Sequence, residues 1–353
     1  WGDEDNERYR SRLVVREDRQ KGKRVVPSHR LFSSMPPLEA LQLLCSMLVT
    51  LKVSKTRRKP LKLKLFDISR AHFYGEARRR VFVTLPEGDE EEGCCGLLQR
   101  SMYGTQDASS IWQGEYSSLL VEGEFKTGVA SSAVFYHAGD IRLLVHGDDF
   151  FVLADEEGQQ YLEKLLSSRY DYRCEGAVGP EDGDGTELCM LNRTIRYDKE
   201  TGVLEYEADQ RHAELIVRTL GLENAKPVST PGEKKKASDV LANMSLPVVS
   251  RERITLFRSL VMRAAYLRQD RGDLTDSVKC LARKMTGPTE EDFQDLKRLA
   301  RFLKGKPRVV LRYEPQRMYK ECTIFTDSDH AGCLRTRRST SGTIVMMGNH
   351  CVK

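Results

Sequence analysis

Two adjacent aspartates separate two apolar runs near the middle of the chain, and this segment constrains the fold more than any other. Residues 141–155 read IRLLVHGDDFFVLAD, with His146, Gly147, Asp148 and Asp149 at the centre. Short runs of branched and aromatic residues on either side of a Gly/Asp break predict two strands joined by a tight turn. The sequence therefore predicts a hairpin that holds two carboxylates at its tip.

Two neighbouring carboxylates on buried strands need an explanation. Like charges repel, and burying them is costly unless a cation neutralises them. Carboxylate oxygens are the ligands that Mg²⁺ prefers, so the tip fits a metal site. Glycine and aspartate are also ordinary turn residues, and the segment alone fits a purely structural hairpin equally well.

The composition is that of a globular protein long enough for two or three domains. The 353 residues are 31% charged and 39% hydrophobic. No apolar run approaches the roughly 20 residues of a membrane helix, so no membrane partner is expected. The N-terminal stretch WGDEDNERYR has no apolar signal region and no initiator Met, which predicts an intracellular piece of a longer protein. Nine cysteines without a C-x-x-C pair argue against a zinc site or disulfide framework.

Apolar periodicity predicts the other elements. Apolar and basic residues alternate over 61–67 (LKLKLFD), which predicts a half-buried strand that ends on Asp67. By the same reasoning we expect strands at 9–17, 81–85 and 134–136, a hairpin of 194–197 with 203–206, and a new strand system from 323. Helices are expected at 36–53, 108–120, 156–170, 209–220, 251–285 and 290–303, a loop at 176–185 and a linker at 227–236. Tyr74, Phe82 and Trp112 are assigned to the core rather than to base stacking.

Asp67, Asp148 and Asp149 form the candidate catalytic set. Three carboxylates on one sheet can hold two Mg²⁺ ions, one lowering the pKa of an attacking 3′-hydroxyl and the other stabilising a pyrophosphate leaving group. Spacing alone makes this set weak, because the chain has 52 acidic residues.

Several segments, in the same order, resemble the Ty1/copia class of retrotransposon Pol polyprotein. Residues 67–88 (DISRAHFYGEARRRVFVTLPEG) resemble the family block DVKTAFLNG…VYMEQPEGF, and 100–112 (RSMYGTQDASSIW) resemble KSLYGLKQAPRAWY. Residues 146–149 stand at the family's YVDD, and 203–231, 257–266 and 299–313 resemble later segments. Residues 326–342 (TDSDHAGCLRTRRSTSG) closely match SDADWAGCPDTRRSTSGY, where the family's RNase H domain opens.

The resemblance implies an α+β fold, the right-hand polymerase of fingers, ferredoxin-like palm and thumb, followed by a helical connection and a truncated RNase H-like α/β segment. The implied parts are shortened fingers and the start of the palm at 1–66, and the palm with the catalytic hairpin at 67–210. They are followed by a thumb-like helix and linker at 211–245, the connection at 246–320 and the RNase H segment at 321–353.

The resemblance also assigns metal ligands and hairpin residues. Asp67, Asp148 and Asp149 match the family's metal-binding aspartates, which implies two Mg²⁺ ions, with Mn²⁺ as the alternative. His146 and Gly147 replace the usual Tyr and Val of the hairpin, next to the primer terminus. Glycine loosens the turn, and the imidazole is still able to contact the primer.

Three residues are implied to contact the incoming nucleotide, and one belongs to a second site. Arg12 is expected at the triphosphate, His72 against the sugar, and Gln106 at a position where the family carries a cation. We expect His72 to relax discrimination between deoxy- and ribonucleotides. Asp327 matches the first RNase H aspartate; because the remaining acids are expected after the TSG segment, that site is expected to be incomplete before Lys353.

The implied function is RNA-directed DNA polymerisation with dNTPs on an RNA or DNA template–primer. Basic clusters at 55–64, 78–80, 234–236 and 335–338 are often solvated surface, and beside these motifs we interpret them as template–primer contacts. The family implies a polyprotein with protease, integrase and capsid, located in a cytoplasmic virus-like particle or the nucleus. The altered motifs leave two alternatives, an inactive remnant that at most binds nucleic acid and a metal-dependent nuclease.

Overall fold

The computed structural model describes residues 13–17, 26–27, 31–51, 59–333 and 336–353. It divides into two compact units, one of Trp1–Leu44 with Arg58–Gly185 and the other of Cys45–Arg57 with Thr186–Lys353. Arg12 lies outside the described residues. The described part of the strand expected at 9–17, residues 13–17, has no regular secondary structure, so that prediction is wrong there.

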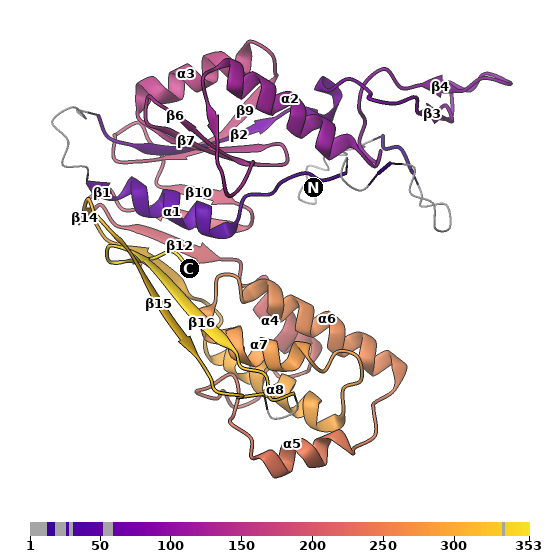
Figure 1. The fold of residues 1–353 in the computed structure, drawn as a ribbon, viewed down its shortest axis with the longest axis vertical. Coiled ribbons are helices and arrows are strands. Elements are labelled where there is room, and N and C mark those ends of the chain that lie inside the picture. The colour runs from indigo at the N-terminus through magenta and orange to yellow at the C-terminus, as the bar shows by residue number, and fades with distance from the viewer. Residues whose placement is uncertain (1–12, 18–25, 28–30, 52–58, 334–335) are drawn as a thin grey trace. The chain divides into compact units, whose positions relative to one another are not determined.

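The first unit is built on a six-stranded antiparallel sheet in the order β5-β6-β7-β8-β2-β9 (Figure 1). Its strands are β2 (Lys62–Ile68), β5 (Lys126–Thr127), β6 (Val134–His137), β7 (Ile141–His146), β8 (Asp149–Ala154) and β9 (Tyr172–Val178). Helix α2 (Ala108–Glu122) follows β2 in the chain, and α3 (Glu156–Ser167) follows β8. With four strands in the order β9-β2-β8-β7, this is the βαββαβ topology of a ferredoxin-like fold.

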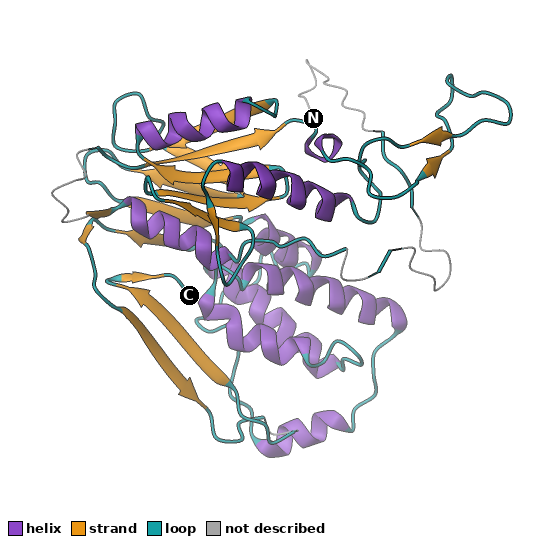
Figure 2. Ribbon diagram, turned by 45° about the horizontal axis from the view of Figure 1, so that its top comes forward, coloured by secondary structure: helices purple, strands orange, loops and turns teal. Residues whose placement is uncertain are grey.

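The core of this unit lies between one face of the sheet and the two helices, which Figure 2 shows in purple. Trp112 and Leu162 from the helices pack with Phe66 and Phe150 from β2 and β8, all fully or almost fully buried. Side chains alternate between the two faces of a strand. The neighbours of Phe66 and Phe150, including Asp67, therefore point to the opposite face.

The remaining elements of the chain up to Gly185 are helix α1 and several short elements. Helix α1 (Leu38–Leu48) begins after Pro36 and Pro37, and β1 (Thr50–Leu51) follows it. The 3-10 helix η2 (Ala71–Tyr74) and the two-residue strands β3 (Phe82–Val83) and β4 (Gly96–Leu97) come before α2. The strand expected at 81–85 is thus shorter. The prediction that Phe82 belongs to the core is wrong, because its side chain is 60% exposed on a separate two-stranded sheet, outside the core of this unit.

The second unit combines a four-stranded sheet with a helical core. The sheet order is β10 (Glu187–Met190), β11 (Arg193–Tyr197), β12 (Leu204–Ala208) and β13 (Val310–Tyr313). The helices are α4 (Arg211–Thr219), α5 (Ala237–Met244), α6 (Arg251–Leu267), α7 (Thr275–Ala282) and α8 (Glu290–Gly305). Buried residues of α4, α6, α7 and α8 form one apolar cluster. The predicted hairpin is confirmed as β11 and β12, which pair antiparallel.

The long helix expected at 251–285 is wrong, because the chain breaks after α6 and passes through the 3-10 helix η3 (Gly272–Leu274). Buried Asp270 sits in the break, where it accepts hydrogen bonds from Arg193 (2.8 Å) and Tyr206 (2.7 Å). A buried carboxylate is stable only with such partners. The break therefore places Asp270 where both donors reach it.

The chain ends in a second small sheet, β15 (Cys322–Ser328), β16 (Ser341–Met347) and β17 (His350–Cys351), drawn as a long ribbon in Figure 2. Strand β14 (Gln316–Arg317) pairs with β1. His350 is buried and contacts Ser46 of α1 (2.8 Å) and the Glu314 carbonyl (2.8 Å). Among the described residues, no helix has both the length and the apolarity needed to cross a bilayer.

Candidate active site

The hairpin predicted at the centre of the chain is present as β7 and β8, joined by Gly147 and Asp148. Gly147 has φ +67°, and glycine with positive φ at the first central position is typical of a type II′ turn, which fits the twist of paired strands. The Trp112 indole of α2 donates to the Gly147 carbonyl (2.7 Å), and the Ile68 amide of β2 donates to the Asp148 carbonyl (2.9 Å). Hydrogen bonds from α2 and β2 therefore fix the backbone carbonyls of both turn residues.

Asp67 and Asp149 are direct partners across β2 and β8. Side chains of directly opposed residues on antiparallel strands have Cβ atoms about 4.5–5.5 Å apart. On either side, His146 pairs with Asp149 and Arg173 of β9 pairs with Asp67. We call the row His146, Asp149, Asp67 and Arg173 the carboxylate row; it lies on the sheet face opposite α2 and α3.

The carboxylate row concentrates negative charge at a half-buried position. Burial raises the pKa of Asp149 to about 6, and the nearby charges of Asp148, Asp67 and Glu175 add to this rise. Glu175 approaches because the β2–β9 register shifts between Leu65 and Phe66. A bulge of this kind re-aims side chains beside it. The site therefore favours a proton or a cation.

The fit to divalent metal is partial. Within the described part of the chain, no group of three or more His, Cys, Asp or Glu side chains is placed to hold a metal ion. Mg²⁺ usually takes only one or two protein carboxylates and completes its shell with water and substrate phosphates. The opposed pair Asp67 and Asp149 meets that smaller requirement, with Asp148 next to it in the turn.

The other predicted site residues lie on separate segments. His72 lies on η2 with its ring against that of Tyr103 (centroids 4.5 Å apart), and Gln106 lies in the loop before α2. Asp327 lies on exposed β15 in the second unit, whereas the carboxylate row lies in the first. The structure thus brings together Asp67, Asp149 and His146, places Asp148 and Gly147 at the adjoining turn, and leaves Asp327 in a different unit.

Sequence reasoning missed Arg173 and Glu175, because it predicted no strand at β9. That segment reads YRCEGAV, and its polar residues and Gly176 break the apolar alternation. Edge strands are commonly polar, so composition gives no signal for this one. Trp112 was predicted as core and is 2% exposed, but its hydrogen bond to the hairpin tip had no sequence signal.

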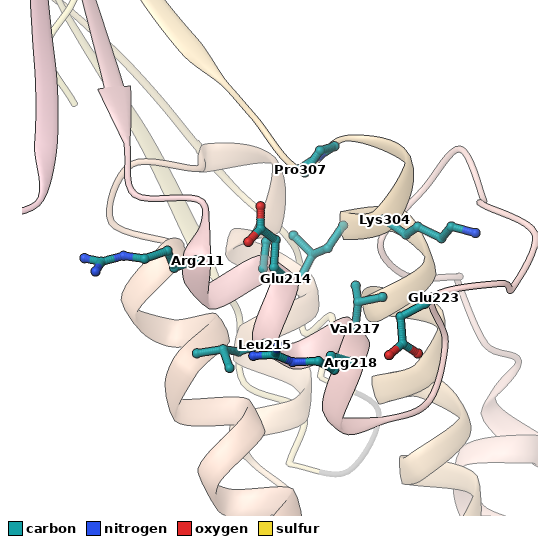
Figure 3. A pocket seen from close by; sticks show the side chains of 10 residues that line it. Arg211, Glu214, Leu215, Val217, Arg218, Glu223, Lys304 and Pro307 are labelled. Atoms are coloured by element: carbon teal, nitrogen blue, oxygen red, sulfur yellow. The ribbon is translucent and has the colours of Figure 1, made fainter. Parts of the chain in front are cut away.

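A cavity lies elsewhere in the described part of the chain. It has a volume of about 540 Å³ and lies between α4 and the end of α8, where Figure 3 shows Glu214, Val217 and Lys304 around it. Two of its cations are engaged, since Arg211 pairs with Asp209 (2.7 Å) and Lys304 donates to the Ala225 carbonyl (2.7 Å). The cavity belongs to the second unit and contains no member of the carboxylate row.

The family model described as "Reverse transcriptase (RNA-dependent DNA polymerase)" matches residues 2–178. This match covers half of the chain and includes the whole ferredoxin-like sheet. The chain therefore belongs to the reverse transcriptase family.

Similar proteins show which kind of reverse transcriptase this chain resembles. The chain is 23% identical over 352 residues to "Retrovirus-related Pol polyprotein from transposon TNT 1-94" of Nicotiana tabacum, covering 95% of this chain and 24% of that protein. It is 25% identical over 353 residues to the transposon RE1 polyprotein of Arabidopsis thaliana, covering 97% and 22%. The chain thus spans about a quarter of the length of these relatives. The predicted resemblance to copia-type retrotransposon polyproteins is confirmed.

A solved structure of a foamy viral protease–reverse transcriptase in complex with double-stranded DNA matches with a TM-score of 0.41 and 11% identity. The match covers 88% of this chain and 44% of that one. At this TM-score the likeness carries no weight, and the family rests on the sequence matches.

Proposed function

We propose that this chain is the RNA-directed DNA polymerase of a copia-type LTR retrotransposon, adding dNTPs to a primer on an RNA or DNA template. The observation that carries the proposal is the opposition of Asp67 and Asp149 on the face of a ferredoxin-like sheet that lies opposite α2 and α3. Family membership alone does not establish activity, because function resides in the site rather than the fold. The raised pKa of Asp149 supports a site prepared for positive charge.

The chain's own residues would hold and orient the reactants. Asp67, Asp148 and Asp149 would hold two Mg²⁺ ions, with Mn²⁺ as a substitute. The bound ions would lower the pKa of the primer 3′-hydroxyl and neutralise charge on the leaving pyrophosphate. Gly147 and His146 would place the hairpin tip against the primer end. Catalysis then depends mainly on positioning and on electrostatic stabilisation.

The division of the chain into polymerase subdomains is also part of the proposal. The palm is residues 67–210, which include the carboxylate row, and it follows shortened fingers and the start of the palm at 1–66. Helix α4 and the following linker, up to residue 245, act as a thumb-like part. The helices up to residue 320 form the connection, and β15 to β17, with Asp327, form the beginning of an RNase H-like segment. We place the protein inside the cell, in a virus-like particle or the nucleus, as part of a polyprotein with protease, integrase and capsid.

One observation favours a second candidate. Because no three acidic or ligand side chains in the described residues are arranged as a ready metal site, the chain also fits a remnant that binds nucleic acid without catalysis. A metal-dependent nuclease that uses the same carboxylates is the third reading.

Primer extension by the purified chain distinguishes these readings. A 5′-labelled DNA primer on an RNA template is incubated with dNTPs and Mg²⁺, and the lengths of both strands are measured. We expect a ladder of extended primers and an intact template. Shortened strands would indicate the nuclease, and salt-dependent binding without change of either strand would indicate the remnant.

A further inference from the structure

Glu17, Arg79 and Asp107 form an ion-pair cluster in the first unit. The Arg79 guanidinium donates to Glu17 through Nη2 (2.6 Å) and to the two Asp107 oxygens through Nε and Nη2 (3.1 Å each). The three side chains are 22%, 13% and 8% exposed, in the order Arg79, Glu17 and Asp107. An exposed ion pair is usually weak and mobile, whereas a buried bidentate one fixes its partners in place.

The cluster anchors a short segment, residues 13–17, which we call the strap. The Val15 amide donates to the Tyr103 carbonyl (2.8 Å), and Glu17 accepts a hydrogen bond from the Gln106 amide (2.7 Å). Gly104 has φ +92°, and a Cβ there would lie 1.8 Å from the Val15 carbonyl oxygen. The backbone of the strap therefore passes against Gly104 at a distance that only glycine allows.

Tyr103 connects the strap to the end of β2. Its ring meets that of His72 at 87° and that of Phe73 at 84°, with centroids 4.5 and 5.7 Å apart. Both rings belong to η2, which begins three residues after β2, the strand that carries Asp67. A continuous series of contacts thus runs from β2 through His72 and Tyr103 to the strap and Arg79.

We propose that Arg79 is a positioning residue for the incoming nucleotide. It holds Glu17 and Asp107, and through them it fixes the Gln106 loop, the strap and the ring pair of Tyr103 and His72. The inference rests on the proposed polymerase function, in which His72 and Gln106 contact the nucleotide. It also changes the interpretation of the basic cluster at 78–80, because this arginine turns inward to acidic side chains rather than outward to a phosphate backbone.

Removing the Arg79 charge leaves two carboxylates facing each other without a cation. Their repulsion and unmet desolvation would release the strap and shift the Gln106 loop. None of the three side chains belongs to the carboxylate row. The loss should therefore weaken nucleotide binding more than it slows bond formation, which appears as a higher KM with kcat nearly unchanged.

The test compares Arg79→Gln with Arg80→Gln. Arg80 is exposed, and no ion pair or side-chain hydrogen bond of Arg80 is found within the described ranges, so both variants remove one positive charge from the same cluster. Arg79→Lys keeps the charge without the bidentate contact. Glu17→Gln is a milder second variant, because it weakens the contacts of the strap with Arg79 and the Gln106 amide but leaves the pair of Arg79 and Asp107. The readouts are KM and kcat for dNTP, template–primer affinity, and hydrogen exchange of the Val15 and Gln106 amides.

Losing a charge-assisted hydrogen bond of this kind should raise KM about tenfold in Arg79→Gln, with kcat within about threefold and template affinity unchanged. Exchange of the Val15 and Gln106 amides should accelerate, and Arg79→Lys and Glu17→Gln should be intermediate. Arg80→Gln should keep the wild-type KM for dNTP and the wild-type amide exchange; any loss that it causes should be one of template–primer affinity, because Arg80 belongs to the basic cluster at 78–80. Equal effects of the Arg79 and Arg80 variants would overturn the proposal. So would faster amide exchange with an unchanged KM.

If the wild-type chain extends no primer, the polymerase proposal is wrong, and the Arg79 proposal is judged separately. The readout is then the equilibrium affinity of the template–primer complex for dNTP with Mg²⁺. A loss of affinity in Arg79→Gln that is smaller in Arg79→Lys and absent in Arg80→Gln would support it. Equal affinity in all variants, including none in any, would overturn it.

Discussion

At the scale of single residues, the ionised carboxylate of Asp149 lowers the stability of the folded chain. Its pKa in the folded protein is about 6, against an ordinary value of 3.8, chiefly because of burial and then because of neighbouring carboxylates. The folded state therefore binds more protons than the unfolded state between these two pH values. Linkage then requires stability to fall as pH rises through this window.

We therefore predict that Asp149→Asn stabilises the metal-free chain at pH 7.5 but has little effect at pH 4. The expected gain at pH 7.5 is about 1–2 kcal/mol, after allowance for solvent screening of a half-buried group. Urea unfolding in EDTA at both pH values measures it. A gain of the same size at both pH values would show that ionisation of Asp149 is not its cause.

At the scale of elements, α2 supports the catalytic hairpin through one hydrogen bond, from Trp112 to the Gly147 carbonyl. Trp112→Phe leaves that carbonyl without its donor and opens space in the core. We predict a loss of about 2–4 kcal/mol in unfolding free energy, together with slower primer extension and faster amide exchange at the hairpin tip. Tyr116→Phe, one turn further along α2, is the control. Unchanged exchange and extension in the Trp112 variant would contradict a supporting role.

Elements with clear periodicity were predictable from the sequence, and those set by tertiary partners were not. The strand that carries Asp67, the central hairpin and α2 all follow from apolar spacing, and their observed bounds lie within one or two residues of the predicted ones. Strand β9 could not be found, because it is an edge strand whose Arg173 and Glu175 face the site. The break after α6 depends on the buried bonds of Asp270 to Arg193 and Tyr206, which no local pattern reveals.

At the scale of the whole molecule, the chain combines a reverse transcriptase sheet unit with a second unit of sheets and helices. The two units are interleaved along the sequence, because α1 begins in the first unit and ends in the second. The site residues divide in the same way, with the carboxylate row in one unit and Asp327 in the other. The proposed polymerase chemistry thus needs only the first unit's sheet for its carboxylates.

The most direct test of that claim is the rate of single-nucleotide addition on an RNA template with Mg²⁺, compared between Asp149→Asn and Asp140→Asn. Asp140 lies in the turn immediately before β7 with φ +65°, which asparagine also tolerates, so this variant controls for loss of one carboxylate in the same sheet. We predict that Asp149→Asn lowers the rate about a thousandfold, roughly 4 kcal/mol of transition-state stabilisation, while Asp140→Asn retains the wild-type rate. Equal rates in the wild type and Asp149→Asn would contradict the assignment of the carboxylate row as the polymerase site.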